Sequence, residues 1–253
     1  MKVTFLGTGT SQGVPVIACH CEVCQSKDLR DKRLRSSILI ETQDKTLVID
    51  TGPDFRQQML RENIACVDAV LFTHEHKDHT AGLDDVRAFN FTRQLPMDVY
   101  SEDRVQKSLM REFSYVFAEK KYPGVPQILL HTITDLPFEV EGIQVIPIRT
   151  MHHELPIFGY RIGEFSYITD TNFISNDEKE KVRGSKFIAI TGLRKKKHIS
   201  HFSLSEALQF LDEMKPEQGY ITHCSHELGL YSNIQKELPE NVKLAYDGLK
   251  IDI

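Results

Sequence analysis

Residues 69–83 read Ala69-Val-Leu-Phe-Thr-His74-Glu-His76-Lys-Asp78-His79-Thr-Ala-Gly-Leu83, an apolar run followed by three histidines and an aspartate within six residues. A regular helix or strand cannot aim all four side chains at one centre, because consecutive side chains point around the axis of a helix and to alternate faces of a strand. The pattern therefore predicts a short loop at the end of a buried strand. Imidazole and carboxylate together favour zinc, manganese, iron, cobalt or nickel over calcium, which prefers oxygen ligands. The dense spacing also indicates two metals, one held by His74 and His76 and one by Asp78 and His79.

The composition is that of a globular protein with room for a sizeable core. The chain has 253 residues, of which 40% are hydrophobic and 26% charged, and we expect one domain over residues 1–253. Its net charge of −5 provides no global basic field for nucleic acid. The N-terminus lacks the apolar stretch of a signal peptide and no run is long enough for a membrane span, so we expect a cytoplasmic protein. Five cysteines, an odd number with three crowded together, favour a reducing compartment and metal binding over disulfides.

Short β-type runs and helical patterns are present in both halves of the chain. The predicted strands are Lys2–Leu6, Ser37–Glu41, Thr46–Asp50, Asp68–Phe72, Ile143–Arg149, Phe158–Ile162, Phe165–Thr169, Lys186–Thr191, Gln218–Thr222, Val242–Tyr246 and Lys250–Ile253. The predicted helices are Asp54–Asn63, Glu102–Phe113 with Ser101 as N-cap, Asn176–Val182, and Ser203–Met214, in which Ser203 and Glu206 form a capping box. This pattern predicts an α/β protein with two mixed sheets and helices outside.

Further ligand-type residues follow predicted strands. His152 and His153 come after one strand, Asp170 ends another, and His223 ends a third. A lone histidine or aspartate at a strand end is weak evidence by itself. Strand ends at one edge of a sheet converge in space, however, so we expect these residues to meet the histidine loop.

The complete set resembles the metallo-β-lactamase superfamily over essentially the whole chain, with the motifs in the superfamily's order. The resemblance implies an αββα sandwich with a two-metal site between the sheet edges. By position, the ligands of the first metal would be His74, His76 and His152, those of the second Asp78, His79 and His223, with Asp170 bridging both and Asp50 orienting the histidine loop. His152 and His153 are adjacent, and the residues that follow favour His152 without excluding His153.

This ligand set implies hydrolysis. Two metals can lower the pKa of a bridging water, giving an activated hydroxide, and can offset charge on the substrate. A bridging aspartate resembles the phosphodiesterase and thioesterase branches, and the cysteine ligand of many true β-lactamases is not seen. We expect zinc or manganese as catalytic ions, with nickel or iron as further options.

A second metal site is indicated by Cys19-His20-Cys21-Glu-Val-Cys24, which places three thiols on one tight turn. A structural zinc needs four ligands, and three cysteines with one histidine form a closed shell. We favour His226 as the fourth ligand, with His20 and Cys224 as rivals.

The cysteine motif and a His-x-x-His segment near the C-terminus together resemble the PhnP-type phosphodiesterases, which act on cyclic phosphates and lie close to tRNase Z. The resemblance implies that the three cysteines and the second histidine hold structural zinc. It also implies that His201, ahead of a helix, acts as general acid or binds the phosphate, alongside Asp78 in catalysis. The basic run Arg194–Lys197 is either a solvated loop or a source of cations for the phosphate.

We therefore expect a phosphodiesterase for small or cyclic phosphodiesters. The alternatives are a tRNA 3′-processing nuclease, a PqqB-like cofactor-maturation protein and a purely structural zinc protein. The chain shows no long basic arm to grip tRNA and its charge is negative, which argues against a nucleic-acid polymer as substrate. A homodimer is a common expectation for this branch, although no patch in the sequence identifies an interface.

Overall fold

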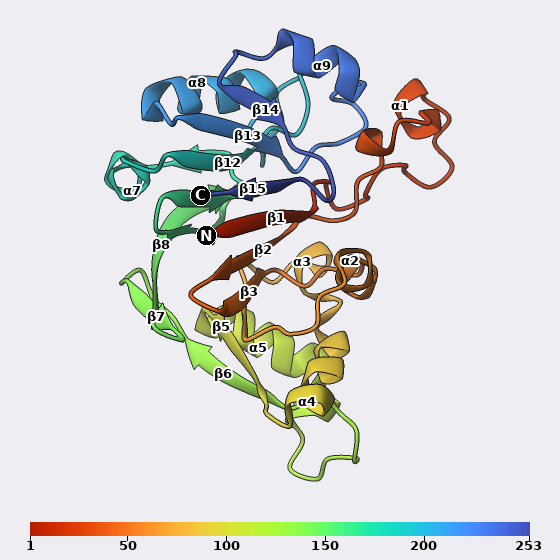
Figure 1. The fold of residues 1–253 in the computed structure, drawn as a ribbon, viewed down its shortest axis with the longest axis vertical. Helices are drawn as coiled ribbons and strands as arrows, with labels where there is room; N and C mark the ends of the chain where they lie inside the picture. Colours follow the sequence, from red (N-terminus) through yellow and green to blue (C-terminus); the bar gives the residue numbers. More distant parts are fainter.

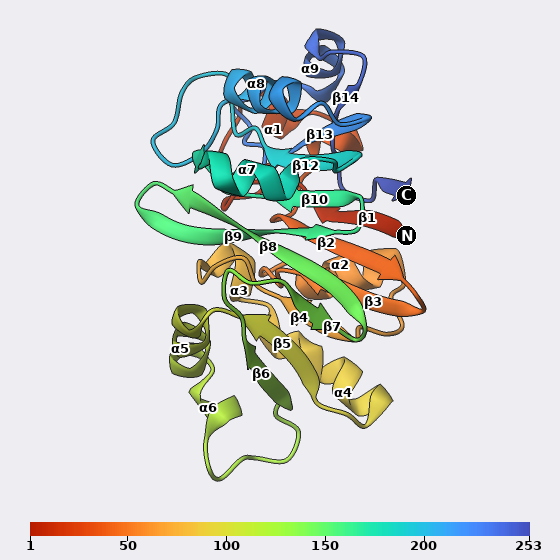
Figure 2. The ribbon, with the colours of Figure 1, turned by 90° about the vertical axis from the view of Figure 1, so that its left-hand side faces the viewer.

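Two β-sheets lie face to face and helices cover both outer faces (Figures 1 and 2). The structure is a computed structural model that describes residues 1–253. It confirms the predicted αββα sandwich of two mixed sheets. The chain ends lie side by side, and the amino group of Met1 donates to the carbonyl oxygen of Ile253 at 2.7 Å (Figure 1). None of the helices is both long and apolar enough to cross a lipid bilayer.

The first sheet has the strand order β15-β1-β2-β3-β4-β5-β6. Its strands are β1 (Lys2–Gly7), β2 (Ser37–Thr42), β3 (Lys45–Ile49), β4 (Ala69–Leu71), β5 (Met97–Ser101), β6 (Ile128–Thr132) and β15 (Lys250–Asp252). Strands β3 to β6 are parallel, so their carboxyl ends share one edge of the sheet. Asp50 and the histidine loop follow β3 and β4 at that edge.

The second sheet has the order β11-β8-β9-β10-β12-β13-β14, with β7 paired to β8. Its strands are β7 (Phe138–Val140), β8 (Ile143–His152), β9 (Leu155–Ile162), β10 (Phe165–Ile168), β11 (Phe173–Ile174), β12 (Phe187–Thr191), β13 (Gln218–Thr222) and β14 (Val242–Leu244). Strands β10, β12, β13 and β14 are parallel, which brings Asp170 and His223 to a common edge.

Nine α-helices surround the two sheets. They are α1 (Glu22–Gln25), α2 (Phe55–Glu62), α3 (Lys77–Thr80), α4 (Arg87–Arg93), α5 (Asp103–Glu112), α6 (Ser114–Phe117), α7 (Asn176–Val182), α8 (Leu204–Met214) and α9 (Tyr231–Glu237), with 3₁₀ turns at Leu29–Asp31 and Leu83–Val86. Buried side chains of α2, α4 and α5 pack on the outer face of the first sheet. Side chains of α7, α8 and α9 pack on the outer face of the second sheet.

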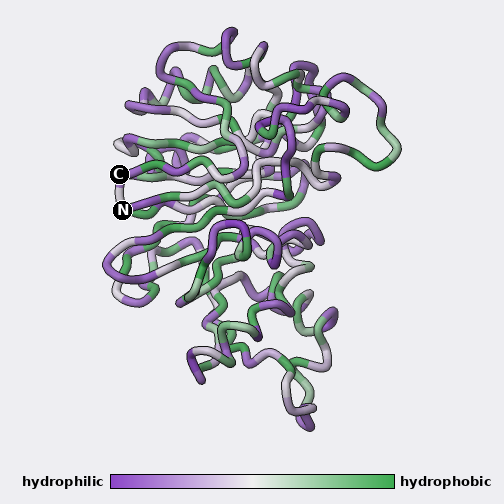
Figure 3. Tube along the Cα trace, turned by 45° about the vertical axis from the view of Figure 1, so that its right-hand side comes forward, coloured by the Kyte–Doolittle hydropathy of each residue, from purple (hydrophilic) through white to green (hydrophobic).

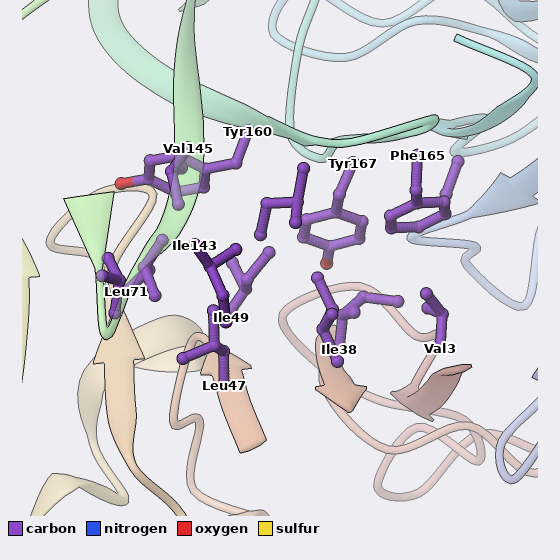
Figure 4. Close-up of a cluster of buried hydrophobic side chains, with 14 of the residues drawn as sticks. Val3, Ile38, Leu47, Ile49, Leu71, Ile143, Val145, Tyr160, Phe165 and Tyr167 are labelled. Atoms are coloured by element: carbon purple, nitrogen blue, oxygen red, sulfur yellow. The ribbon is translucent and has the colours of Figure 1, made fainter. Parts of the chain in front are cut away.

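The central core fills the space between the sheets. Figure 4 shows Tyr160, Phe165 and Tyr167 of the second sheet facing Ile38 and Ile49 of the first. The tube in Figure 3 is accordingly most hydrophobic along the inner strands and hydrophilic in many outer turns. Full burial of each large apolar side chain contributes about 1.5–3 kcal/mol, so this layer holds the two sheet edges in a defined relation.

Most predicted elements are present, and the differences arise where local signals are weak. The prediction of Ser101 as an N-cap is wrong, because Ser101 is the last residue of β5 and Glu102 precedes α5 without a side-chain cap. Helices α4 and α9 were not predicted, and neither has a capping side chain at its start. The capping box of α8 is present, with Ser203 and Glu206 bonded reciprocally.

Candidate metal centre

Asp50 supports the histidine loop through hydrogen bonds. It directly follows β3 and is fully buried. Asp50 accepts hydrogen bonds from the Thr73 N–H at 2.9 Å, the Thr73 hydroxyl at 2.8 Å and His79 Nδ1–H at 2.7 Å. Its φ of 65° turns the backbone sharply after the strand. With its Nδ1–H donated to Asp50, His79 directs its Nε2 toward the site, where a bound metal would take the place of a proton.

Two glycines allow the loops around the site to pack closely. A Cβ on Gly52 would lie 2.2 Å from the Asp78 carbonyl oxygen, and a Cβ on Gly82 would lie 2.1 Å from the Gly52 carbonyl oxygen. Neither position can carry a larger residue without a shift of the backbone. The segment after β3 and the segment after β4 therefore stay in contact.

Three imidazoles face one point at the outer end of the site. Nε2 of His74 lies 3.0 Å from Nδ1 of His76, and one nitrogen of each of these and of His152 lies within 4.8 Å of the others. Nδ1 of His74 bonds the Thr73 hydroxyl at 2.9 Å, and Nδ1 of His152 donates to the Ser200 carbonyl oxygen at 2.9 Å. These bonds place the ring protons of His74 and His152 on Nδ1 and leave Nε2 of both rings unprotonated.

The structure distinguishes the two adjacent histidines. His152 ends β8 with its ring 5.1 Å from that of His76, measured between centroids. His153 is exposed, has a φ of 56°, and donates its backbone N–H to Asn172 Oδ1 at 2.8 Å. Only His152 lies with the other candidate ligands.

Asp170 occupies the middle of the cluster. Its Oδ1 lies 3.1 Å from His223 Nε2 and its Oδ2 lies 3.2 Å from His79 Nε2. Asp78 Oδ2 also lies 3.2 Å from His79 Nε2, and Asp78, Asp170 and His223 form one group of close donors. Asp170 and His223 both have left-handed φ values, 57° and 53°, which turn the chain sharply at the strand ends.

The charges around these residues fit bound cations. Burial lowers the pKa of His74, His76 and His223, so these rings are neutral. Burial also acts to lower the pKa of His79, but Asp170, Asp78 and Asp50 outweigh it and raise that pKa well above its usual value. Nε2 of His79 and of His223 are buried without hydrogen-bond partners. Neutral imidazoles, clustered carboxylates and orphaned nitrogens form a donor set suited to divalent metals.

His201 lies beside this cluster at the start of α8. It is 8% exposed, and its Nδ1 lies 3.9 Å from Asp170 Oδ1 without a hydrogen-bond partner. Ring centroids of His152 and His223 lie 4.6 and 5.0 Å from that of His201. The predicted catalytic histidine is therefore close to both halves of the cluster.

The basic run Arg194–Lys197 is largely neutralised by acidic neighbours. Its ion pairs are Arg194 with Glu227, Lys195 with Glu237 at 2.6 Å and Lys197 with Glu206 at 3.6 Å. Only Lys196 of the run has no acidic partner within 4 Å. The run is thus closer to the solvated loop than to the cation source.

The cysteine motif and His226 form a separate group. His226 Nδ1 lies 3.3, 3.4 and 3.6 Å from the sulfurs of Cys19, Cys21 and Cys24. The rivals lie apart, since neither His20 nor Cys224 joins the group. A backbone hydrogen bond from Cys24 lowers the pKa of Cys21 to about 6, while burial raises that of Cys24 to about 11. Three sulfurs and one nitrogen match the ligand set of a structural zinc.

Sequence reasoning missed the residues that orient the imidazoles. Ser36 Oγ lies 3.1 Å from His223 Nδ1, while Thr73 and the Ser200 carbonyl hold His74 and His152. Thr73 directly precedes the histidine motif and could have been suspected. Ser36 and Ser200 carry no local signal, since they meet their histidines only in the folded chain.

Comparisons with known proteins identify the family of the chain. Residues 45–224 match the family model of the Beta-lactamase superfamily domain. A solved structure described as a new diphosphatase from the PhnP family has a TM-score of 0.93 at 37% identity, covering 100% of this chain and 97% of that one. Zinc-bound PqqB from Methylobacterium extorquens has a TM-score of 0.80 at 18% identity, covering 100% of both chains, which shows a shared fold.

A curated protein of Porphyromonas gingivalis named Octanoyltransferase is 42% identical over 253 residues, which cover 99% of this chain but 51% of that protein. The chain thus spans about half the length of this relative. The family match extends from β3 to Cys224 and includes every histidine and aspartate of the central cluster. The fold implies divalent metal binding. The chain belongs to the metallo-β-lactamase superfamily of hydrolases.

Proposed function

We propose that the protein is a metal-dependent phosphodiesterase acting on a small phosphodiester, such as a cyclic ribose or nucleotide phosphate. The observation that carries the proposal is Asp170, whose two oxygens face His223 and His79 separately while His201 lies alongside. A carboxylate in this position can serve two ions at once.

The chain offers a complete set of ligands for two ions. His74, His76 and His152 would hold one, Asp78, His79 and His223 the other, and Asp170 both. When bound, two divalent ions supply a water of lowered pKa and offset negative charge on the phosphate. Zinc, manganese, iron and nickel all suit these donors.

His201 supports the proposal because it can donate a hydrogen bond to the substrate. Burial lowers the pKa of His201 to about 3, so the ring is neutral at pH 7 in the free protein. A neutral imidazole N–H donates a hydrogen bond to a phosphate oxygen or to the departing oxygen. Asp170 lies beside it and favours the ring's protonated form once negative charge develops.

The neighbour described as a diphosphatase supports a small phosphorus-containing substrate. A polymer such as precursor tRNA would need positive charge to hold its backbone. The net charge here is −5, and the basic run beside the site is mostly paired with glutamates. A small phosphodiester therefore suits the surface better than tRNA.

A second candidate is hydrolysis or transfer of an acyl group, which the relative named Octanoyltransferase favours. An activated water attacks a carbonyl carbon as it does phosphorus, so the same residues could act on an acyl ester. The two candidate functions differ in the atom that the water attacks, phosphorus or a carbonyl carbon, and not in the residues that would bind the metals.

The test is metal analysis together with turnover of bis-p-nitrophenyl phosphate, 2′,3′-cyclic nucleotides and p-nitrophenyl octanoate. We expect about three metals per chain and cleavage of the phosphodiesters. Asp170→Asn should abolish turnover, whereas the exposed Asp212→Asn should not. One zinc with no turnover after addition of manganese or zinc would contradict the proposal and favour a PqqB-like or structural role. Cleavage of the octanoate alone would favour the acyl candidate.

A further inference from the structure

A row of three imidazoles leads outward from the buried cluster. His223 is 1% exposed and His201 8% exposed, and their ring centroids lie 5.0 Å apart. The His198 ring lies 5.2 Å beyond that of His201 and is half-buried. His198 belongs to none of the groups of candidate metal ligands. It therefore lies on the more exposed side of the proposed catalytic histidine.

The hydrogen bonds of His198 define where its proton lies. Its Nδ1 accepts the backbone N–H of Ser200 at 3.3 Å and lies 3.1 Å from the Ser200 hydroxyl. A backbone N–H can only donate, so Nδ1 is the acceptor and the ring proton is on Nε2. No protein group forms a hydrogen bond with that Nε2. His198 thus keeps one nitrogen for Ser200 and has a free donor on the other.

The loop Lys197–His201 is built around the site as a unit. Ser200, held by His198, accepts the Nδ1–H of His152 through its carbonyl oxygen at 2.9 Å. Asn172 donates its side-chain amide to the Ile199 carbonyl oxygen at 3.1 Å, and Phe202 N–H donates to the Thr171 carbonyl oxygen at 2.6 Å. These bonds fasten the loop to the segment after Asp170, so the His198 ring has a defined place.

We propose that His198 binds the substrate phosphate, donating its Nε2–H to a non-bridging oxygen beside the contact made by His201. This inference rests on the proposed function and names a residue that sets its specificity for phosphate. The arginine and two of the lysines nearby are held by glutamates, so a neutral imidazole donor at this position supplies a contact that they do not. A hydrogen bond to a charged oxygen is also stronger than one to a neutral group.

Two substitutions separate this role from support of Ser200. His198→Asn keeps an acceptor near the position of Nδ1 and loses the donor at Nε2. His198→Gln can place an amide N–H near Nε2 and loses the acceptor for Ser200. Binding of inorganic phosphate to the metal-loaded proteins is measured by calorimetry, with the metal content of each variant determined. We expect about 10-fold or weaker phosphate binding for His198→Asn, and binding within about threefold of the parent for His198→Gln.

Phosphate binding in His198→Asn equal to that of the parent would overturn the inference. An equal loss in both variants would also overturn it, because the residue would then act only through Ser200 and His152. The calorimetric result does not depend on turnover. A parent protein that binds phosphate through His198 but cleaves no phosphodiester would refute the proposed function and leave the phosphate contact standing.

Discussion

Substitution of Asp50 by asparagine tests whether this carboxylate orients His79 for metal binding. The carboxylate is fully buried and accepts from Thr73 on one side and from His79 on the other. An asparagine has only one accepting oxygen, and its amide nitrogen would face either the Thr73 donors or His79 Nδ1–H. The ring of His79 therefore loses its acceptor or the loop loses its support.

The expected loss of metal affinity follows from these hydrogen bonds. Loss of a partner that orients a metal-binding histidine lowers metal affinity about 10- to 100-fold, which is about 1.4–2.8 kcal/mol. The change should fall on the ion proposed to bind Asp78, His79 and His223. Zinc proposed to bind Cys19, Cys21, Cys24 and His226 should remain, because Asp50 does not contact that group.

The assay is competition with a chelator, which gives the number of ions bound and their affinities for the parent and Asp50→Asn. Asp68→Asn is the matched control, since Asp68 is also buried and accepts the Thr46 N–H at 2.7 Å, but lies at the start of β4 away from the histidines. Its metal affinities should equal those of the parent. If Asp50→Asn bound all of its ions within about twofold of the parent, the role given to Asp50 would be wrong.

Three other changes have distinct outcomes. His152→Ala should lower kcat/KM for bis-p-nitrophenyl phosphate by about 100-fold or more. His153 is exposed beside it, so kcat/KM of His153→Ala should stay within about twofold of the parent value. Similar losses in both variants would contradict the assignment of His152. Zinc affinity of the cysteine site should rise about tenfold or more per pH unit between pH 7 and 9, because the Cys24 thiol must lose its proton to bind zinc and burial raises its pKa to about 11. A zinc affinity that does not change with pH in chelator competition would refute this. Ser203→Ala should reduce the free energy of unfolding by about 1 kcal/mol in urea titration, because the capping box of α8 is lost, and an unchanged midpoint relative to Ser232→Ala, on the exposed face of α9, would count against it.

Local patterns accounted for much of the fold. The apolar run before His74 and the capping box at Ser203 each produced the expected element, because their signals lie within a few residues. Helix α9 follows Leu230, which offers no capping side chain, and α4 continues directly from a 3₁₀ turn. Such short helices are stabilised by packing on the sheets rather than by helix propensity, so their sequences contain few local signals that predict them.

The types of candidate ligand, their order and the family of fold could be predicted from the sequence, because histidines, aspartates and cysteines at these spacings have few other uses. Which of the neighbouring candidates lie together depends on the tertiary structure. His152 lies inward and His153 outward because a left-handed turn at His153 follows the end of β8. His226 meets Cys19 across 207 positions of sequence, and Ser36 meets His223 across 187. Contacts over such separations depend on how the two sheets are paired and packed, which no local stretch of residues specifies.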